Sequence, residues 1–197
     1  EAININHVHT LVLDEADKLM DVGFNEELTA LLNALPAQRQ NLLFSATLPQ
    51  KVLSLSARVL NEPTVLRIDE QHTSVATIEQ RAYQVDREKR RLLLQHLLQS
   101  EPWGQTLIFV ATQKGATHLA KKLRVDGFKA AELHGGLDQS DRIFALKRFK
   151  SGKTPVMVAT DLAARGIDIP LLGAVVNFDL PRSPVDYIHR IGRTGRA

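Results

Sequence analysis

The sequence predicts an α/β protein in which two units with parallel β-sheets follow each other along the chain. Short apolar runs alternate with segments of helical periodicity, a pattern typical of parallel strands joined by helices. Polar clusters directly follow four of the apolar runs. Residues 70–77 show no periodicity, so we expect a linker there between a first unit, residues 1–69, and a second unit, residues 78–197.

The first unit begins with an apolar run typical of a buried strand, Val8–Leu13. Leucines at helical spacing predict a helix over Phe24–Leu35, with Asn25 as a suitable N-cap and Pro36 at its end. The other expected elements are the strand Asn41–Phe44, a helix with Pro49 in its first turn that reaches about Leu60, and the strand Thr64–Ile68. Because a buried strand lies close to the start, we expect this unit to be truncated at its N-terminus.

The second unit repeats the alternation, and Gly127 and Gly152 mark the ends of two helices. The expected strands are Ile78–Val85, Thr106–Val110, Ala130–Leu133, Val156–Ala159 and Ala174–Asn177. The expected helices are Arg87–Gln99, Gln113–Asp126, Asp138–Lys150 and Ser183–Ile191. In such a sheet the polar clusters lie at the carboxyl ends of the strands, which is where open α/β sheets bind ligands.

Composition narrows the class of protein. The 197 residues are 44% hydrophobic and 24% charged, as in ordinary globular proteins, and no apolar run approaches the ~18 residues that span a bilayer. The absence of cysteine excludes disulfides and thiolate metal sites, and it fits a reducing cytoplasm. Residues 1–77 hold 5 Lys/Arg against 10 Asp/Glu, whereas residues 78–197 hold 20 against 12. This asymmetry favours a polyanionic partner for the second unit, with a solvated basic surface as the alternative.

The acidic cluster after the first strand is the first candidate site. Asp14, Glu15 and Asp17 follow the apolar residues 11–13 directly. Carboxylates at a strand end do not pack a core, because a buried charge must be paired or meet a metal. An acidic pair in this place is how nucleotide-hydrolysing folds hold Mg²⁺ against a triphosphate. The alternative is a solvated acidic turn.

The basic segment His189–Ala197 is the second candidate site. Arg190, Arg193 and Arg196 recur every third residue and would share a face if the segment were helical. Arginine makes bidentate contacts with phosphate and does not lose its proton, so a guanidinium aimed at a γ-phosphate would stabilise phosphoryl transfer. The alternative is a basic helix that binds the backbone of a nucleic acid.

Six short motifs in register resemble those of the DEAD-box ATP-dependent RNA helicases. The segments that resemble motifs II, III, IV, V and VI and the QxxR element are Asp14–Asp17, Ser45–Thr47, Leu107–Val110, Ala159–Asp168, His189–Arg193 with Gly195–Arg196, and Gln139–Arg142. Their order and separation match the family, and they extend over essentially the whole chain. The resemblance implies two tandem RecA-like domains, and the pairing of Asp17 with His189 favours the DEAD type over the related DEAH type.

The resemblance also implies ATP and Mg²⁺ as cofactors and a role for each matching residue. Asp14 would hold Mg²⁺ through water, and Glu15 would polarise the attacking water as general base. Asp17 would contact Ser45 or Thr47 and also His189, coupling the two domains. The residues that would contact ATP in the second domain are Arg193 and Arg196, as arginine fingers, and Asp168, at the ribose.

RNA is the partner that the resemblance implies, bound through its backbone with low sequence preference. The residues that would contact it or align the interface are Gly135, Arg142, Thr160 and Arg165. Such binding should weaken steeply as salt increases. Ser45 and Thr47 have an alternative role as caps of the helix after Pro49. We expect a monomer in the cytoplasm, with no membrane contact.

One part of the family pattern is missing from these residues. The chain contains no G-x-x-x-x-G-K-[ST] phosphate-binding loop, whose backbone N–H groups and lysine cradle the phosphates. Because this loop is missing, we expect this chain alone not to hydrolyse ATP. We expect the parent protein to hydrolyse it, as the resemblance implies. Two alternatives stay open: a non-catalytic RNA- or partner-binding module, and a fragment of a DNA helicase of the same superfamily.

Overall fold

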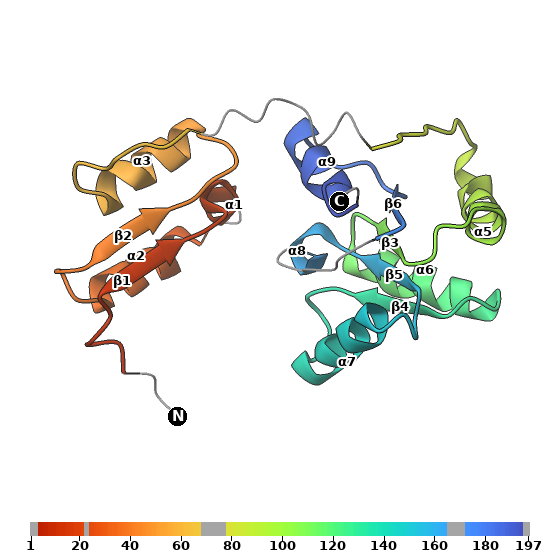
Figure 1. Cartoon of the computed structure of the whole chain (residues 1–197). Helices are drawn as coiled ribbons and strands as arrows, with labels where there is room; N and C mark the ends of the chain where they lie inside the picture. Colours follow the sequence, from red (N-terminus) through yellow and green to blue (C-terminus); the bar gives the residue numbers. More distant parts are fainter. Residues whose placement is uncertain (1–3, 22–23, 68–77, 165–171, 195–197) are drawn as a thin grey trace. The chain divides into compact units, whose positions relative to one another are not determined.

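The computed structural model describes residues 4–21, 24–67, 78–164 and 172–194 (Figure 1). The chain divides into two compact units, Glu1–Ile68 and Asp69–Ala197, which are considered separately below. None of the helices in the described segments has the length and apolar character that crossing a bilayer requires.

Unit 1 is built around two parallel strands, β1 (Thr10–Leu13) and β2 (Gln40–Leu43), which pair from Thr10 opposite Gln40 onward. Its helices are α1 (Ala16–Asp21), α2 (Asn25–Ala34) and α3 (Gln50–Val59). The core joins α3 to the carboxyl end of β1, since Val52, Leu55 and Val59 pack with Leu13 and Ala16. This packing fixes the chain immediately after β1, where the acidic cluster lies.

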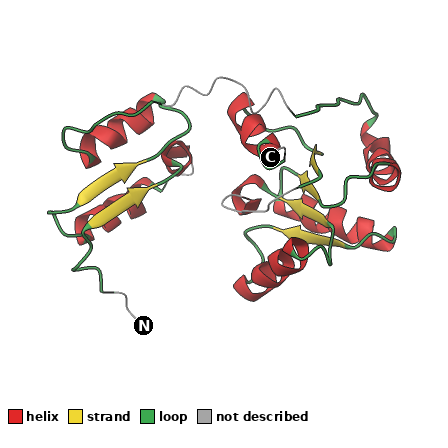
Figure 2. Cartoon of the chain, viewed as in Figure 1, coloured by secondary structure: helices red, strands yellow, loops and turns green. Residues whose placement is uncertain are grey.

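Unit 2 holds a parallel sheet in the order β4-β5-β3-β6; its strands are labelled in Figure 1 and drawn in yellow among red helices in Figure 2. The strands are β3 (Thr106–Phe109), β4 (Ala130–Leu133), β5 (Val156–Ala159) and β6 (Ala174–Asn177). The described helices are η1 (Arg87–Lys89), α5 (Arg90–Ser100), α6 (Gln113–Val125), α7 (Gln139–Lys150), α8 (Asp161–Ala164) and α9 (Pro184–Ile191).

Both faces of the sheet in unit 2 are covered by helices, as is usual for parallel sheets. Leu107 and Phe109 of β3 face a core that includes residues of α7 and α8. The intervening Ile108 faces a second core that includes residues of α5 and α6. Because side chains alternate along a strand, an uninterrupted apolar run such as β3 supplies both cores. The predicted α/β class with parallel sheets is therefore confirmed.

Two of the predicted strands are wrong within the described residues. Residues 64–67 form no ladder, and Leu66 is 86% exposed; Ile68 lies outside the described residues. Residues 78–85 form no ladder either. They make side-chain hydrogen bonds instead: the Tyr187 hydroxyl, for example, donates to Gln80 Oε1 at 2.6 Å. An apolar or alternating run becomes a strand only where another strand offers its backbone groups.

The helix starts also differ from expectation. Phe24 occupies the N-cap of α2, so Asn25 is the first helical residue and does not cap. Pro49 is the N-cap of α3 with extended backbone angles, one position before the first turn. The short helices α1 and α8 were not predicted, because four to six residues are too few to show a helical period.

Candidate functional site

The turn after β1 carries two of the three carboxylates of the first candidate site, those of Asp14 and Glu15. Asp14 is exposed, and its Oδ1 accepts a hydrogen bond from the Glu15 N–H at 2.8 Å. Glu15 has φ +50°, a left-handed conformation that costs free energy for any residue other than glycine. Its carbonyl accepts hydrogen bonds from the N–H groups of Lys18 and Leu19, which lie in the first turn of α1. The acidic pair therefore lies on a strained strand-to-helix turn.

Asp17 is joined to the loop that follows β2. It is 4% exposed, and its Oδ2 accepts a hydrogen bond from the Thr47 hydroxyl at 3.0 Å. The Asp17 N–H donates to Ser45 Oγ at 3.2 Å, and the Ser45 hydroxyl donates to the Thr47 carbonyl at 2.6 Å. The contact expected between Asp17 and Ser45 or Thr47 is present with both residues. It compensates the burial of the Asp17 carboxylate.

The same hydrogen bonds decide between two readings of Ser45 and Thr47. The helix after them, α3, has Pro49 at its N-cap and no side-chain capping hydrogen bond. The backbone supports the link to β1 instead, since the Phe44 N–H donates to the Leu13 carbonyl at 2.7 Å and the Ala16 N–H to the Phe44 carbonyl at 3.0 Å. Ser45 and Thr47 therefore hold the turn after β1 and do not cap α3.

The acidic turn fits a Mg²⁺ ion held by few protein ligands. Within the described segments, no group of three or more His, Cys, Asp or Glu residues could enclose a metal ion. Mg²⁺ keeps several waters and is usually bound by one or two carboxylates together with substrate phosphates. The exposed carboxylate of Asp14 at the carboxyl end of β1 matches that donor set.

In unit 2 the carboxyl ends of β4 and β5 bring together three of the residues expected to contact RNA. Thr160 follows β5, and its N–H donates to the carbonyl of Leu133, the last residue of β4, at 3.2 Å. Arg142 reaches from α7 to the Ala163 carbonyl, which accepts from its Nη2 at 3.3 Å. Gly135 lies exposed just beyond β4. These positions share one edge of the sheet, as the topology predicts.

His134, which precedes Gly135, is a structural residue. It is buried, and its Nδ1 accepts a hydrogen bond from the Gly136 N–H at 3.1 Å. Its Nε2 lies 2.9 Å from the Thr117 hydroxyl oxygen. Because Nδ1 accepts, Nε2 carries the proton and donates to Thr117. The neutral ring thus fixes the turn that presents Gly135.

The arginine-rich segment behaves differently from the expected shared helical face. Helix α9 ends at Ile191, with Gly192 at its C-cap, so Arg193 lies in the following turn. Arg193 and His189 are both half-buried. Arg196, together with Arg165 and Asp168, lies outside the described residues. The condition for a common face of Arg190 and Arg193 is therefore not met, because the helix ends between them.

Arg190 is the functional-segment residue whose place sequence reasoning missed. It is 3% exposed, and its guanidinium makes a bidentate pair with Asp161 at 2.6 and 2.7 Å. It also donates to Asn177 Oδ1 at 2.8 Å and to the Asp179 carbonyl at 2.6 Å, and it lies over the Phe109 ring. Arg190 thus anchors α9 to the strand ends of its own unit.

Asp179 is a second missed residue in this network. It follows β6 closely, and its carboxylate accepts hydrogen bonds from Arg90 and from the Ala111 N–H, each at 2.9 Å. The sequence did hold a signal for Asp161 and Asp179, since both come after apolar strands as Asp14 does. Here the carboxylates organise strand ends through arginine.

Parallel sheets with polar side chains at the carboxyl ends of their strands and helices on both faces place this chain among the α/β proteins that bind ligands at that edge. Sequence profiles agree: the profile described as "Helicase conserved C-terminal domain" matches residues 88–197, and that described as "DEAD/DEAH box helicase" matches residues 1–55. The chain belongs to the DEAD-box ATP-dependent RNA helicase family.

Individual relatives support the assignment. The chain is 41% identical over 195 residues to the DEAD-box ATP-dependent RNA helicase CshA of Geobacillus kaustophilus, covering 99% of this chain and 42% of that protein. It is 41% identical over 201 residues to the ATP-dependent RNA helicase DBP2 of Debaryomyces hansenii, covering 98% of this chain and 37% of that protein. The chain thus spans about two fifths of the length of these curated relatives.

Solved structures show the same fold. S. cerevisiae Dbp5 bound to RNA and ADP BeF3 is 33% identical with a TM-score of 0.86, covering 98% of this chain and 52% of that one. A DEAD box protein from Methanococcus jannaschii is 37% identical with a TM-score of 0.59, covering 99% and 52%. These likenesses confirm the predicted RecA-like fold, and the profile matches confirm the family that the motifs resemble.

Proposed function

We propose that this chain is the part of an ATP-dependent RNA helicase that reaches from the acidic turn to the arginine-rich segment. Residues 1–69 are the C-terminal part of the first RecA-like domain, residues 70–77 the linker, and residues 78–197 the second RecA-like domain. The parent couples ATP binding and hydrolysis to local unwinding of RNA duplexes or remodelling of RNA–protein complexes. The observation that carries this proposal is the buried Asp17 carboxylate, hydrogen-bonded to Thr47, which fixes the turn holding Asp14 and Glu15.

Each expected residue has a stated role in the proposal. Asp14 binds Mg²⁺ through water, and Glu15 accepts a proton from the attacking water. Bound ATP with Mg²⁺ supplies the phosphoryl group. Arg193 and Arg196 neutralise charge on the γ-phosphate, and Asp168 holds the ribose. The residues proposed to couple nucleotide and RNA binding are Asp17, Ser45, Thr47 and His189.

RNA binds the second domain through its backbone. The residues proposed for this contact are Gly135, Arg142, Thr160 and Arg165. Support comes from the common sheet edge of Thr160 and Arg142 and from the basic balance of residues 78–197. Relatives named as RNA helicases and a neighbour solved with RNA favour RNA over DNA. We propose that the parent acts as a monomer in the cytoplasm.

The catalytic part of the proposal is tested in the full-length parent with Glu15→Gln. We expect RNA-stimulated phosphate release to fall about 100-fold or more, because a general base contributes 10²–10⁴-fold, while ATP binding persists. Glu27→Gln, at an exposed position of α2, is the matched control and should leave the rate unchanged. Full activity of Glu15→Gln would contradict the role of Glu15, and equal stimulation by DNA would contradict the choice of RNA.

A further inference from the structure

Strand β4 leaves one side of its backbone unpaired within the described part of the sheet. It is the edge strand in the order β4-β5-β3-β6. The carbonyls of Lys129 and Leu133 accept from the N–H groups of Val156 and Thr160, so these carbonyls face β5. Because backbone groups alternate in direction along a parallel strand, those of Ala130 and Glu132 face outward. Such a row of polar groups is a template for another strand.

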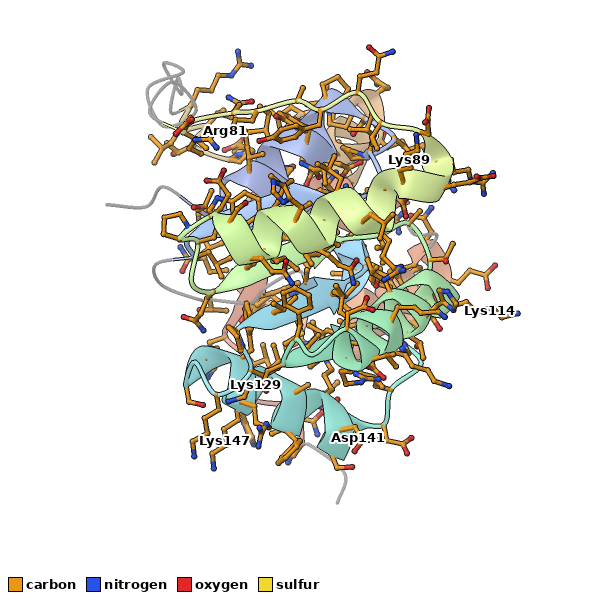
Figure 3. All side chains as sticks on the ribbon, turned by 90° about the vertical axis from the view of Figure 1, so that its right-hand side faces the viewer. Arg81, Lys89, Lys114, Lys129, Asp141 and Lys147 are labelled. Atoms are coloured by element: carbon orange, nitrogen blue, oxygen red, sulfur yellow. The ribbon has the colours of Figure 1, made fainter. Side chains whose placement is uncertain are left out.

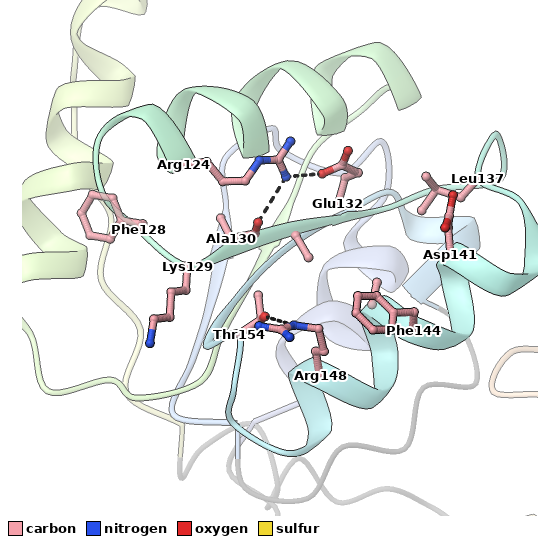
Figure 4. A pocket seen from close by; sticks show the side chains of 12 residues that line it. Arg124, Phe128, Lys129, Ala130, Glu132, Leu137, Asp141, Phe144, Arg148 and Thr154 are labelled. Atoms are coloured by element: carbon pink, nitrogen blue, oxygen red, sulfur yellow. Dashed lines mark hydrogen bonds and ion pairs between the residues drawn. The ribbon is translucent and has the colours of Figure 1, made fainter.

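A groove runs beside this edge (Figure 4). Its volume is about 470 Å³, and β4 forms one wall while the other is the α7 face that carries Asp141, Phe144 and Arg148. Those positions follow helical spacing, so α7 presents them together. Phe144 is 61% exposed, a large apolar ring available at the surface. We call this feature, lined by Phe128, Lys129, Ala130, Glu132, Phe144 and Arg148, the β4 groove.

An arginine covers the edge in the present structure. Arg124 Nη1 donates to the Ala130 carbonyl at 3.2 Å and to Glu132 Oε2 at 2.6 Å, as Figure 4 shows. The Arg124 and Glu132 side chains are 43% and 20% exposed, and the pair lies at the surface, where single ion pairs contribute little to stability. Arg124 can therefore exchange Glu132 for another carboxylate, which would free the outward face of β4.

The charges around the β4 groove favour an acidic occupant. Lys129 is exposed beside β4, and Lys147 is exposed on α7; both are labelled in Figure 3. Arg148 lies across the groove, where its Nε donates to Thr154 Oγ1 at 3.2 Å and its guanidinium lies 5.6 Å from the centre of the Phe144 ring. The carboxylates of Glu132 and Asp141 also line the groove, so its cations are separated and do not form the continuous basic track that a phosphate backbone would follow. An unpaired strand edge, an exposed ring and separate cations suit a peptide.

We propose that the β4 groove binds an extended acidic segment of a partner protein, which adds as a strand to β4 and packs an apolar side chain against Phe144. Main-chain hydrogen bonds to Ala130 and Glu132 supply affinity, and alternate side chains of the segment meet the lysines and Arg148. The proposal does not depend on ATP or RNA chemistry, because none of the residues proposed for those roles lines the groove.

The test measures binding of the 197-residue chain to a fluorescein-labelled twelve-residue peptide in which Val and Phe alternate with Glu and Asp. The deciding pair of variants is Glu132→Pro and Glu132→Ala. Both variants lose the Glu132 carboxylate, but only proline removes the outward N–H, and it does so without removing a ladder hydrogen bond. We expect Glu132→Pro to weaken binding at least tenfold and Glu132→Ala to leave it unchanged or tighter. Circular dichroism and amide NMR spectra confirm that both variants fold.

A second pair of variants tests the side-chain contacts. Phe144→Ala and Lys129→Glu should each weaken the peptide at least fivefold, whereas Lys114→Glu, at an exposed lysine on α6, should not. A peptide in which Lys replaces Glu and Asp should bind at least tenfold more weakly. The proposal is overturned if the acidic peptide does not bind at 1 mM, or if these variants leave its affinity unchanged. It is also overturned if a single-stranded RNA shifts the β4 amide signals at lower concentration than the peptide.

Discussion

At the scale of single residues, Arg190 and Arg193 show that two arginines three positions apart can have different environments. Arg190 is buried and bonded to Asp161, Asn177 and the Asp179 carbonyl. Arg193 lies half-buried in the turn after α9. Both arginines look alike in the sequence, and only the structure shows that Arg190 is held by residues at the strand ends.

The buried pair predicts a large loss of stability for Arg190→Gln. The substitution leaves the Asp161 carboxylate without its bidentate partner, so we expect the free energy of unfolding to fall by about 3 kcal/mol. This is the lower end of the range for buried pairs because the Asp161 side chain is 36% exposed. Urea unfolding measures the loss, and Asp161→Asn in the same background should add little further. A change no larger than that of the exposed control below would contradict the anchoring role.

Arg81 is the matched control at an exposed site. Its guanidinium contacts Glu79 at 2.7 Å and Glu101 at 2.9 Å, with the Arg81 side chain 47% exposed. The hydrogen bond to Glu79 is the largest cause of a pKa for Arg81 above its ordinary value. A raised pKa means that Arg81 stays charged in the folded protein. Any contribution of its ion pairs to the free energy of unfolding is fully present at every pH below the ordinary pKa of arginine, so it does not change with pH near neutrality. Arg81→Gln should leave the urea midpoint nearly unchanged.

At the scale of elements, the sequence correctly predicted those helices and strands that follow from hydrophobic periodicity and from glycines at helix ends. The strands of unit 2 from β3 to β6 and the helices ended by Gly127 and Gly152 follow from local signals, and both glycines have positive φ. Residues 64–67 and 78–85 have strand-like sequences but form no ladder, because pairing depends on a partner elsewhere. The acidic turn was found from its residue types, but the hydrogen bonds of Asp17 required the fold.

Helix α9 carries the arginine-rich segment, and its start offers an element-scale prediction. Ser183 Oγ accepts from the Asp186 N–H at 3.1 Å, and its hydroxyl donates to Asp186 Oδ2 at 2.7 Å. Ser183→Ala should lower the free energy of unfolding by about 1 kcal/mol, the usual loss for an N-cap, and Ser183→Thr should retain most of it. The control is Ser140→Ala, at an exposed position in α7, with little expected change. Equal urea midpoints for Ser183→Ala and Ser140→Ala would contradict the capping role.

At the scale of the whole molecule, the charge asymmetry between the two units fits the proposed binding of RNA through its phosphate backbone. The excess of Lys/Arg lies in residues 78–197, where the proposed RNA contacts Arg142 and Thr160 share a sheet edge. Backbone contacts release counterions, so the affinity of the chain for a single-stranded RNA should fall at least tenfold between about 50 and 200 mM salt. Arg142→Ala should weaken binding and reduce that salt slope, as fluorescence anisotropy can measure. An affinity that is independent of salt would contradict backbone recognition.

The 197-residue chain alone should release no phosphate from ATP, because none of its glycines lies in a complete phosphate-binding loop. The segment Gly152–Lys153–Thr154 has the last three residues of a phosphate-binding loop, but Lys147 stands where the motif needs its first glycine. The segment also leads from α7 into β5, whereas a phosphate loop leads from a strand into a helix, and Thr154 accepts a hydrogen bond from Arg148 at 3.2 Å. With no such cradle among the 197 residues, Glu15 has no positioned triphosphate to act upon.

A malachite-green assay with RNA, ATP and Mg²⁺ should therefore give equal background rates for the chain and its Glu15→Gln variant. A higher rate in the unsubstituted chain would show that these residues assemble an ATPase site of their own.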